Sequence, residues 1–194
     1  MASMMQLSAS DSITLGRLFD PEAAPPPAVP VSNSLPSDPH YSEEELSSLQ
    51  STERKAIVNA ETAPSEAFSL LSELITSHPR YASAYNNRAQ LRRLMKQSNE
   101  EVLADLDLAI EYASPKVAGD PVSPAQARVL KNAYTQRGAV FDATGKEKEA
   151  HQDFEAAAKY GSDVARQWLV ANNPYARLCG QIVSEVMKKE IGAQ

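Results

Sequence analysis

One short pattern occurs twice in this chain and constrains its fold more than any other feature. Residues 84–89 have the sequence AYNNRA and residues 133–138 have AYTQRG, and an aspartate followed by a large apolar residue comes about twenty positions after each. Such recurrence is typical of stacked helical hairpins, in which each hairpin buries its apolar face against the next. Glycine occurs only 7 times, and no run alternates apolar and polar residues as strands do. We therefore expect an all-α protein.

The residue types at the repeated positions have a packing explanation. Small residues let two helices approach closely, and large ones fill the spaces between hairpins. This arrangement resembles the tetratricopeptide repeat (TPR), a helix–turn–helix unit of about 34 residues, and implies a short solenoid of three repeats at about 48–81, 82–115 and 131–162. The first copy is degenerate, because Ser51 and Arg54 stand where large apolar residues are usual. The expected repeat-packing residues are Tyr85, Ala89, Leu106, Ala109, Tyr134, Gly138, Phe141, Ala150, Phe154 and Ala157.

Capping residues mark where the helices begin. Ser42 with Glu45 and Ser123 with Gln126 are typical capping boxes, and Asn99 precedes two glutamates. Helices are expected near 43–60, 64–77, 82–96, 100–113, 124–143, 147–159, 163–171 and 174–191. The last two lie within 163–194 and are expected to cap the open end of the third repeat.

Residues 1–41 differ in composition from the rest of the chain. Seven of the 13 prolines lie between residues 20 and 40, with few large apolar side chains to offset the entropy lost on ordering. We expect a mostly disordered acidic segment, except for a short amphipathic motif at 11–19 that ends before Asp20-Pro21. One hypothesis for this motif is a tethered segment that docks on the folded domain.

The charge distribution argues against two classes of partner. The net charge is −6, and seven acids against one base within the first 45 residues account for all of it. The remaining residues hold 18 acids and 18 bases, so we expect neither nucleic acid nor a membrane surface as a partner. No segment is apolar over the length of a bilayer, and no basic region followed by an apolar run marks an exported protein. A cytoplasmic location is expected, with the nucleus left open.

No arrangement of reactive side chains predicts catalysis or a bound metal. The single cysteine, Cys179, cannot form an intrachain disulfide and is expected to be a buried structural thiol. The three histidines, His40, His78 and His151, lack the spacing of a metal site. We therefore expect a protein that is not an enzyme and holds no cofactor.

The inner face of the solenoid is expected to be rich in amides. Helix periodicity places polar side chains of repeats two and three on this face. Amides hydrogen-bond an extended peptide backbone without requiring a charge. Two interpretations stay open, a groove that binds a protein segment and a polar surface that contacts only water. The expected groove residues are Asn86, Asn87, Gln90, Arg93, Asn132, Thr135 and Gln136.

Three short motifs indicate a more specific resemblance. Residues 18–21 have the sequence LFDP, residues 85–90 have YNNRAQ, and residues 172–179 have NNPYARLC. Together they resemble the tetratricopeptide repeat protein 36 family over nearly the whole chain outside the proline-rich part. The resemblance implies a non-enzymatic binding protein, linked in that family to the Hsp70 chaperone and to protection of 4-hydroxyphenylpyruvate dioxygenase, an enzyme of tyrosine breakdown.

Some chaperone-binding TPR proteins hold an acidic C-terminal peptide in a carboxylate clamp of lysine, asparagine and arginine side chains. Aligned with that pattern, the five clamp positions hold Thr52, Ala56, Asn87, Asn132 and Gln136. Because every cation is missing, clamp binding of acidic chaperone tails is not expected. The favoured hypothesis is an adaptor or cochaperone-like scaffold that binds a segment of a client protein. The alternative is a constitutive structural subunit of a larger complex.

Overall fold

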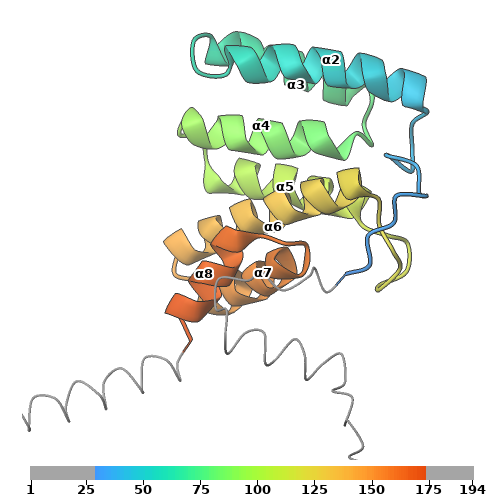
Figure 1. Ribbon diagram of the computed structural model, residues 1–194. Coiled ribbons are helices and arrows are strands. Elements are labelled where there is room, and N and C mark those ends of the chain that lie inside the picture. The colour runs from blue at the N-terminus through green and yellow to red at the C-terminus, as the bar shows by residue number, and fades with distance from the viewer. Residues whose placement is uncertain (1–28, 174–194) are drawn as a thin grey trace, which may run out of the picture.

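The computed structural model describes residues 29–173, and this part of the chain is built from helices (Figure 1). Successive helices pair into antiparallel hairpins, α2 with α3, α4 with α5 and α6 with α7, and the hairpins stack in sequence order. Helix α8 lies against α7 at the end of the stack. The expected all-α fold is confirmed. The elements are α2 (Glu43–Asn59), α3 (Pro64–Ser77), α4 (Ala82–Leu94), α5 (Asn99–Ala113), α6 (Pro124–Ala143), α7 (Glu147–Lys159) and α8 (Asp163–Ala171).

The helix ends follow the capping signals at all but two places. Both expected capping boxes form, at Ser42 before α2 and at Ser123 before α6. Helix α5 is capped by Ser98 instead of Asn99, because the Ser98 hydroxyl accepts the backbone N–H of Glu101 at 3.3 Å. Helix α4 ends at Leu94, earlier than expected, where the chain turns through a positive φ of 57° at Lys96.

Small side chains lie where paired helices touch. Within the third hairpin, Gly138 on α6 faces α7 so closely that an added Cβ would lie 3.3 Å from the Cβ of Asp153 and 3.3 Å from the ring of Phe154. The structure also buries most of the other expected packing residues and leaves Tyr134 and Phe141 half-buried. The close approach of the helices therefore depends on residue size at these positions. The fully enclosed alanines among them are Ala89, Ala109, Ala150 and Ala157.

The first hairpin has a different register from the expected one. Helix α2 buries Leu49 and Glu53, whereas Ser51 and Arg54 are exposed. Leu49 therefore occupies the position that a large residue, Tyr85 or Tyr134, fills in the other repeats. Glu53 occupies the buried position that Gly138 fills in the third repeat. The sequence misleads here because a glutamate is rarely buried, and the repeat pattern in α2 in fact begins two residues earlier than expected.

Residues 29–41, expected to be disordered, pack against the helical stack; we call them the N-terminal strap. Val31 forms an isolated parallel β-bridge with Val122 in the loop between α5 and α6. Tyr41 packs against the main core at the other end of the strap. The folded unit thus begins earlier than its proline content suggests, because apolar side chains between the prolines find partners in the stack.

Helix α8 closes the stack largely through Trp168, with Ala165 buried beside it. The ring of Trp168 stacks on that of Phe154 with centroids 4.4 Å apart, and its indole N–H donates to Asp142 at 3.1 Å. The expected helix at 174–191, the thiol of Cys179 and the motif at 11–19 lie outside the described residues.

Candidate protein-binding groove

Two adjoining hollows lie along the first helices of the hairpins. Helices α2, α4 and α6 line the first hollow, and α4, α6 and the start of α8 line the second. One has a volume of about 390 Å³ and the other about 480 Å³. Their walls share Asn86, Asn87 and Asn132, so we describe them as one feature, the groove. All seven residues expected on the inner face, Asn86, Asn87, Gln90, Arg93, Asn132, Thr135 and Gln136, lie in its wall.

Some of these seven side chains are already bonded within the protein. Asn86 is buried, and its side-chain oxygen accepts a hydrogen bond from the Gln136 amide at 2.9 Å. The Thr135 hydroxyl lies 2.8 Å from that of Ser162. Asn87 donates its amide to Glu53 at 2.6 Å. These contacts hold the groove wall in shape and reduce the number of groups that can reach a ligand.

Gln90, Arg93 and Asn132 are the free members of the set. All three side chains are exposed. Within residues 29–173 none of them takes part in a side-chain hydrogen bond or an ion pair. Their amide and guanidinium groups can therefore bind an external peptide without breaking an internal contact.

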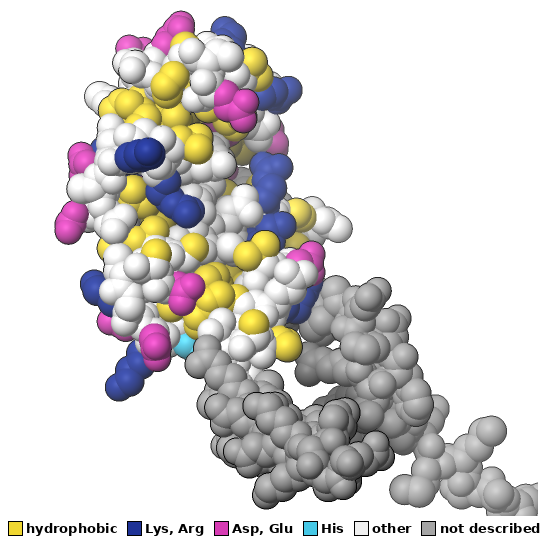
Figure 2. Space-filling view, turned by 90° about the vertical axis from the view of Figure 1, so that its left-hand side faces the viewer, with side chains coloured by type: hydrophobic (Ala, Val, Ile, Leu, Met, Phe, Trp, Pro, Cys, Tyr) yellow, Lys and Arg dark blue, Asp and Glu magenta, His cyan; other side chains and the backbone are white. Residues whose placement is uncertain are grey.

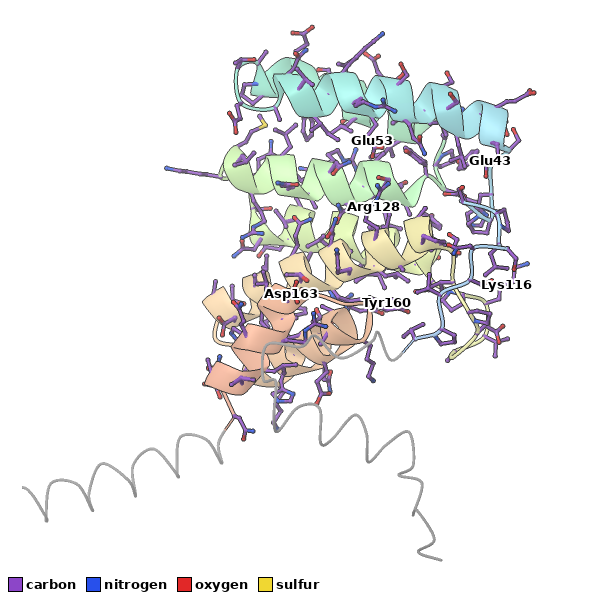
Figure 3. The ribbon with its side chains drawn as sticks, in the orientation of Figure 1. Glu43, Glu53, Lys116, Arg128, Tyr160 and Asp163 are labelled. Atoms are coloured by element: carbon purple, nitrogen blue, oxygen red, sulfur yellow. The ribbon has the colours of Figure 1, made fainter. Side chains whose placement is uncertain are left out.

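Glu53 forms a buried polar centre at one end of the groove. Only 7% of the residue is exposed. Its carboxylate accepts hydrogen bonds from the Tyr81 hydroxyl at 2.8 Å, the Ser83 hydroxyl at 2.5 Å and the Asn87 amide at 2.6 Å. These three donors come from the start of α4, so the cluster fixes α2 to α4 through charge-assisted hydrogen bonds. Figure 3 shows Glu53 between these two helices.

The environment of Tyr81 has a consequence for pH. Burial, and then the neighbouring carboxylate of Glu53, raise the pKa of the Tyr81 hydroxyl above its ordinary value. In the unfolded chain the same hydroxyl has the ordinary tyrosine pKa of about 10 and loses its proton near that pH. The stability linked to this group is therefore complete below that pH and is lost as the pH rises further.

We expect the free energy of unfolding to fall steeply above about pH 10. The Tyr81→Phe variant should be less stable at neutral pH, because Glu53 loses a hydrogen-bond donor. Its stability should nevertheless decline less than that of the natural protein between about pH 9.5 and 11, which brackets the ordinary tyrosine pKa of about 10. Urea unfolding across this range measures both effects. Parallel profiles for the two proteins would contradict the prediction.

The corrected register of the first hairpin changes the comparison with the carboxylate clamp. When the register of the first repeat is moved two residues toward the N-terminus, its two clamp positions hold Gln50 and Arg54 in place of Thr52 and Ala56. Both Gln50 and Arg54 line the groove, whereas Ala56 is buried in the core. The expectation that every clamp position lacks a cation is therefore wrong at Arg54. The clamp asparagine, Asn87, is engaged by Glu53.

Two further cations of the groove, both on α6, are not among the residues expected from the sequence. Arg128 and Lys131 line the groove beside Asn132. The signal was available for Arg128, because it precedes Asn132 by one helical turn and therefore shares its face. Neither cation belongs to the short repeated pattern, which begins only at Ala133.

Within residues 29–173 no group of histidine, cysteine, aspartate and glutamate side chains could hold a metal ion. Over the same range, no helix has both the length and the apolar surface that crossing a bilayer requires.

Comparison with known proteins identifies the family. No family model matches the chain. Tetratricopeptide repeat protein 36 of Danio rerio is 34% identical, and the match covers 94% of this chain and 94% of that protein. The chain belongs to the tetratricopeptide repeat protein 36 family. The same protein of Xenopus tropicalis is 39% identical over 78% of this chain. The L-tyrosine degradation gene cluster protein hmgX of Aspergillus fumigatus is 31% identical over 97% of this chain and 95% of its own length.

Membership of the tetratricopeptide repeat protein 36 family agrees with the motifs in the sequence. One of them, YNNRAQ at residues 85–90, lies on α4 and supplies Asn86, Asn87 and Gln90 to the groove wall. The motif therefore joins a core residue, Tyr85, to the polar side chains of the groove.

Proposed function

We propose that this protein is a non-enzymatic adaptor that binds an extended segment of a client protein in the groove. The observation that carries the proposal is the set of exposed, unbonded groups on Gln90, Arg93 and Asn132, which come from two neighbouring helices and face one hollow. Helical repeats use such inner faces to bind other proteins, because stacking creates an extended concave surface. An amide side chain can both donate and accept hydrogen bonds, so it can bind the N–H or the C=O groups of a segment without secondary structure.

Family membership supports a class of client. The relative from Aspergillus fumigatus is named for an L-tyrosine degradation gene cluster. We extend that association to this chain and propose that the client is an enzyme of tyrosine breakdown, bound in the cytoplasm. The dioxygenase that acts on 4-hydroxyphenylpyruvate is the first candidate, because the family resemblance already implies it.

A groove variant tests the adaptor function. Replacing Gln90, Arg93 and Asn132 together by alanine should reduce capture of the client by at least about tenfold, since three contacts of about 0.5–1.5 kcal/mol each are lost. The fold should survive, because all three side chains are exposed. Asn87 is left unchanged, because its removal would deprive Glu53 of a donor.

The measurement is crosslinking of the native protein in cell extract, followed by pull-down of the identified client with each variant. A matched control replaces Arg80, Asn99 and Gln152, which are exposed and lie outside the groove wall. The control should capture the client as well as the natural protein does. Equal capture by the groove variant would overturn the proposal.

A further inference from the structure

Four cations line the groove without a partner. They are Arg54 on α2, Arg93 on α4, and Arg128 and Lys131 on α6. Within residues 29–173 none of the four forms an ion pair or donates a side-chain hydrogen bond. Three other arginines of the stack, Arg88, Arg92 and Arg137, each contact an aspartate instead. The groove wall thus holds four free cations, contributed by three neighbouring helices.

The acids in the groove wall do not neutralise these cations. Glu53 is buried and held by three uncharged donors. Asp163, at the start of α8, pairs with Arg166, which is not part of the wall. The wall therefore presents four free cations and two acids that are already engaged. A surface of this kind attracts negative charge.

The figures show the same arrangement. Helices α2, α4 and α6 face the viewer in Figure 1 and lie on the right-hand side of Figure 2, where lysine and arginine side chains follow one another down the edge of the molecule. Figure 3 shows Glu53 and Arg128 on this side of the ribbon, one above the other. The cations therefore follow the direction in which the repeats are stacked.

We propose that the groove selects an extended protein segment rich in aspartate or glutamate side chains; this inference rests on the proposed adaptor function. The free cations pair with the acidic side chains, while Gln90 and Asn132 bond the peptide groups between them. Two exposed apolar side chains, Ile57 and Val164, lie in the wall toward its two ends and offer contacts to apolar residues flanking the acids.

The lining residues favour a peptide over a single-stranded nucleic acid. Nucleic-acid grooves of the same charge stack bases on aromatic rings. No aromatic side chain lies in the wall formed by the described residues. Amide and aliphatic side chains fill the spaces between the cations instead, and these suit peptide groups and aliphatic side chains.

The recognised carboxylates belong to side chains within the segment, and a free C-terminus is not needed. The clamp amide that would hold a terminal carboxylate belongs to Asn87, and the carboxylate of Glu53 already accepts its hydrogen bond at 2.6 Å. Three of the four free cations, Arg93, Arg128 and Lys131, stand outside the clamp positions. An acidic segment with a blocked C-terminus should therefore bind as well as one with a free C-terminus.

The test uses the full chain and three fluorescently labelled peptides of one length, with C-terminal amides. They are rich in glutamate, in glutamine at the same positions, or in lysine at the same positions. Fluorescence anisotropy should show binding of the glutamate peptide at least about tenfold tighter than of the glutamine peptide, and no binding of the lysine peptide. Affinity for the glutamate peptide should fall with added salt.

Charge reversal assigns the binding to the groove. The Arg54→Glu, Arg128→Glu double variant should lose the glutamate peptide, whereas the Lys55→Glu, Lys148→Glu control, at exposed sites outside the wall, should keep it. Circular dichroism checks that both variants remain helical.

Equal binding of the glutamine peptide would overturn acidic selection and leave the adaptor function intact. Tighter binding of polyuridylate through the same arginines would also overturn the proposal, in favour of nucleic acid. Client capture that ignores the Gln90, Arg93, Asn132 variant would instead overturn the adaptor function.

Discussion

Replacing Asp105 by alanine should lower the free energy of unfolding by about 3–5 kcal/mol. Asp105 on α5 is 4% exposed, and its carboxylate accepts hydrogen bonds from Arg88 at 2.6 and 2.9 Å and from Arg92 at 2.8 Å. The two arginines come from α4 and are only 15% and 13% exposed, so removing the acid leaves two poorly solvated cations side by side. Urea unfolding, monitored by circular dichroism, measures the loss.

Asp107, on the same helix, provides the matched control. It pairs with Arg137 at 2.6 Å but is 61% exposed. Arg137 keeps its second partner, Asp153, at 2.7 Å when Asp107 is removed. Asp107→Ala should therefore cost no more than about 1 kcal/mol, as exposed ion pairs usually do. Similar losses for the two variants would contradict the idea that burial makes the Asp105 contacts important.

Replacing Phe154 by alanine is expected to cost about 3–5 kcal/mol and to release α8 from the stack. Phe154 is almost fully buried beneath Gly138, and its ring stacks on Trp168. Trp168 is the single tryptophan of the chain, so its fluorescence reports this contact directly. The emission maximum should shift to longer wavelength under conditions in which the rest of the protein stays folded, because the indole becomes exposed to water.

Two control substitutions, one at the same position and one far from it, test whether the effect of Phe154→Ala is specific. Phe154→Leu keeps most of the side-chain volume and should cost less than Phe154→Ala. Leu94→Ala, at a mostly exposed position on α4, should leave both stability and fluorescence nearly unchanged. Unchanged tryptophan emission in Phe154→Ala would show that α8 is held by other contacts.

The sequence predicts the second and third repeats well because their residues obey helix periodicity. Gly138 and the buried alanines have the sizes that close helix pairs require, and the polar residues one turn apart on α4 and α6 share one face. Arg54, Arg128 and Lys131 in the groove wall were not anticipated, but the seven expected wall residues followed from this periodicity alone. Hydrogen bonding within the wall did not, because the bond from Asn87 to Glu53 joins residues far apart in the chain.

The first repeat and the strap show where sequence patterns are insufficient. Glu53 occupies a buried position that small residues fill elsewhere, and only its three donors on α4 make that position tolerable for a carboxylate. The strap carries many prolines, and its order depends on Val122 in a distant loop. In both cases tertiary contacts decide the outcome, and these are not visible in local composition.

The N-terminal strap also alters how the repeats cooperate. A plain array of hairpins can fray from either end, since each hairpin contacts only its neighbours. Here Val31 is bridged to Val122, and the Ser123 hydroxyl donates to the Ser37 carbonyl at 3.0 Å, so the residues leading into α2 are fastened to the entrance of α6. Unfolding of the first hairpin should therefore also disrupt the start of the third, and thermal unfolding should be more cooperative than in a linear array of hairpins.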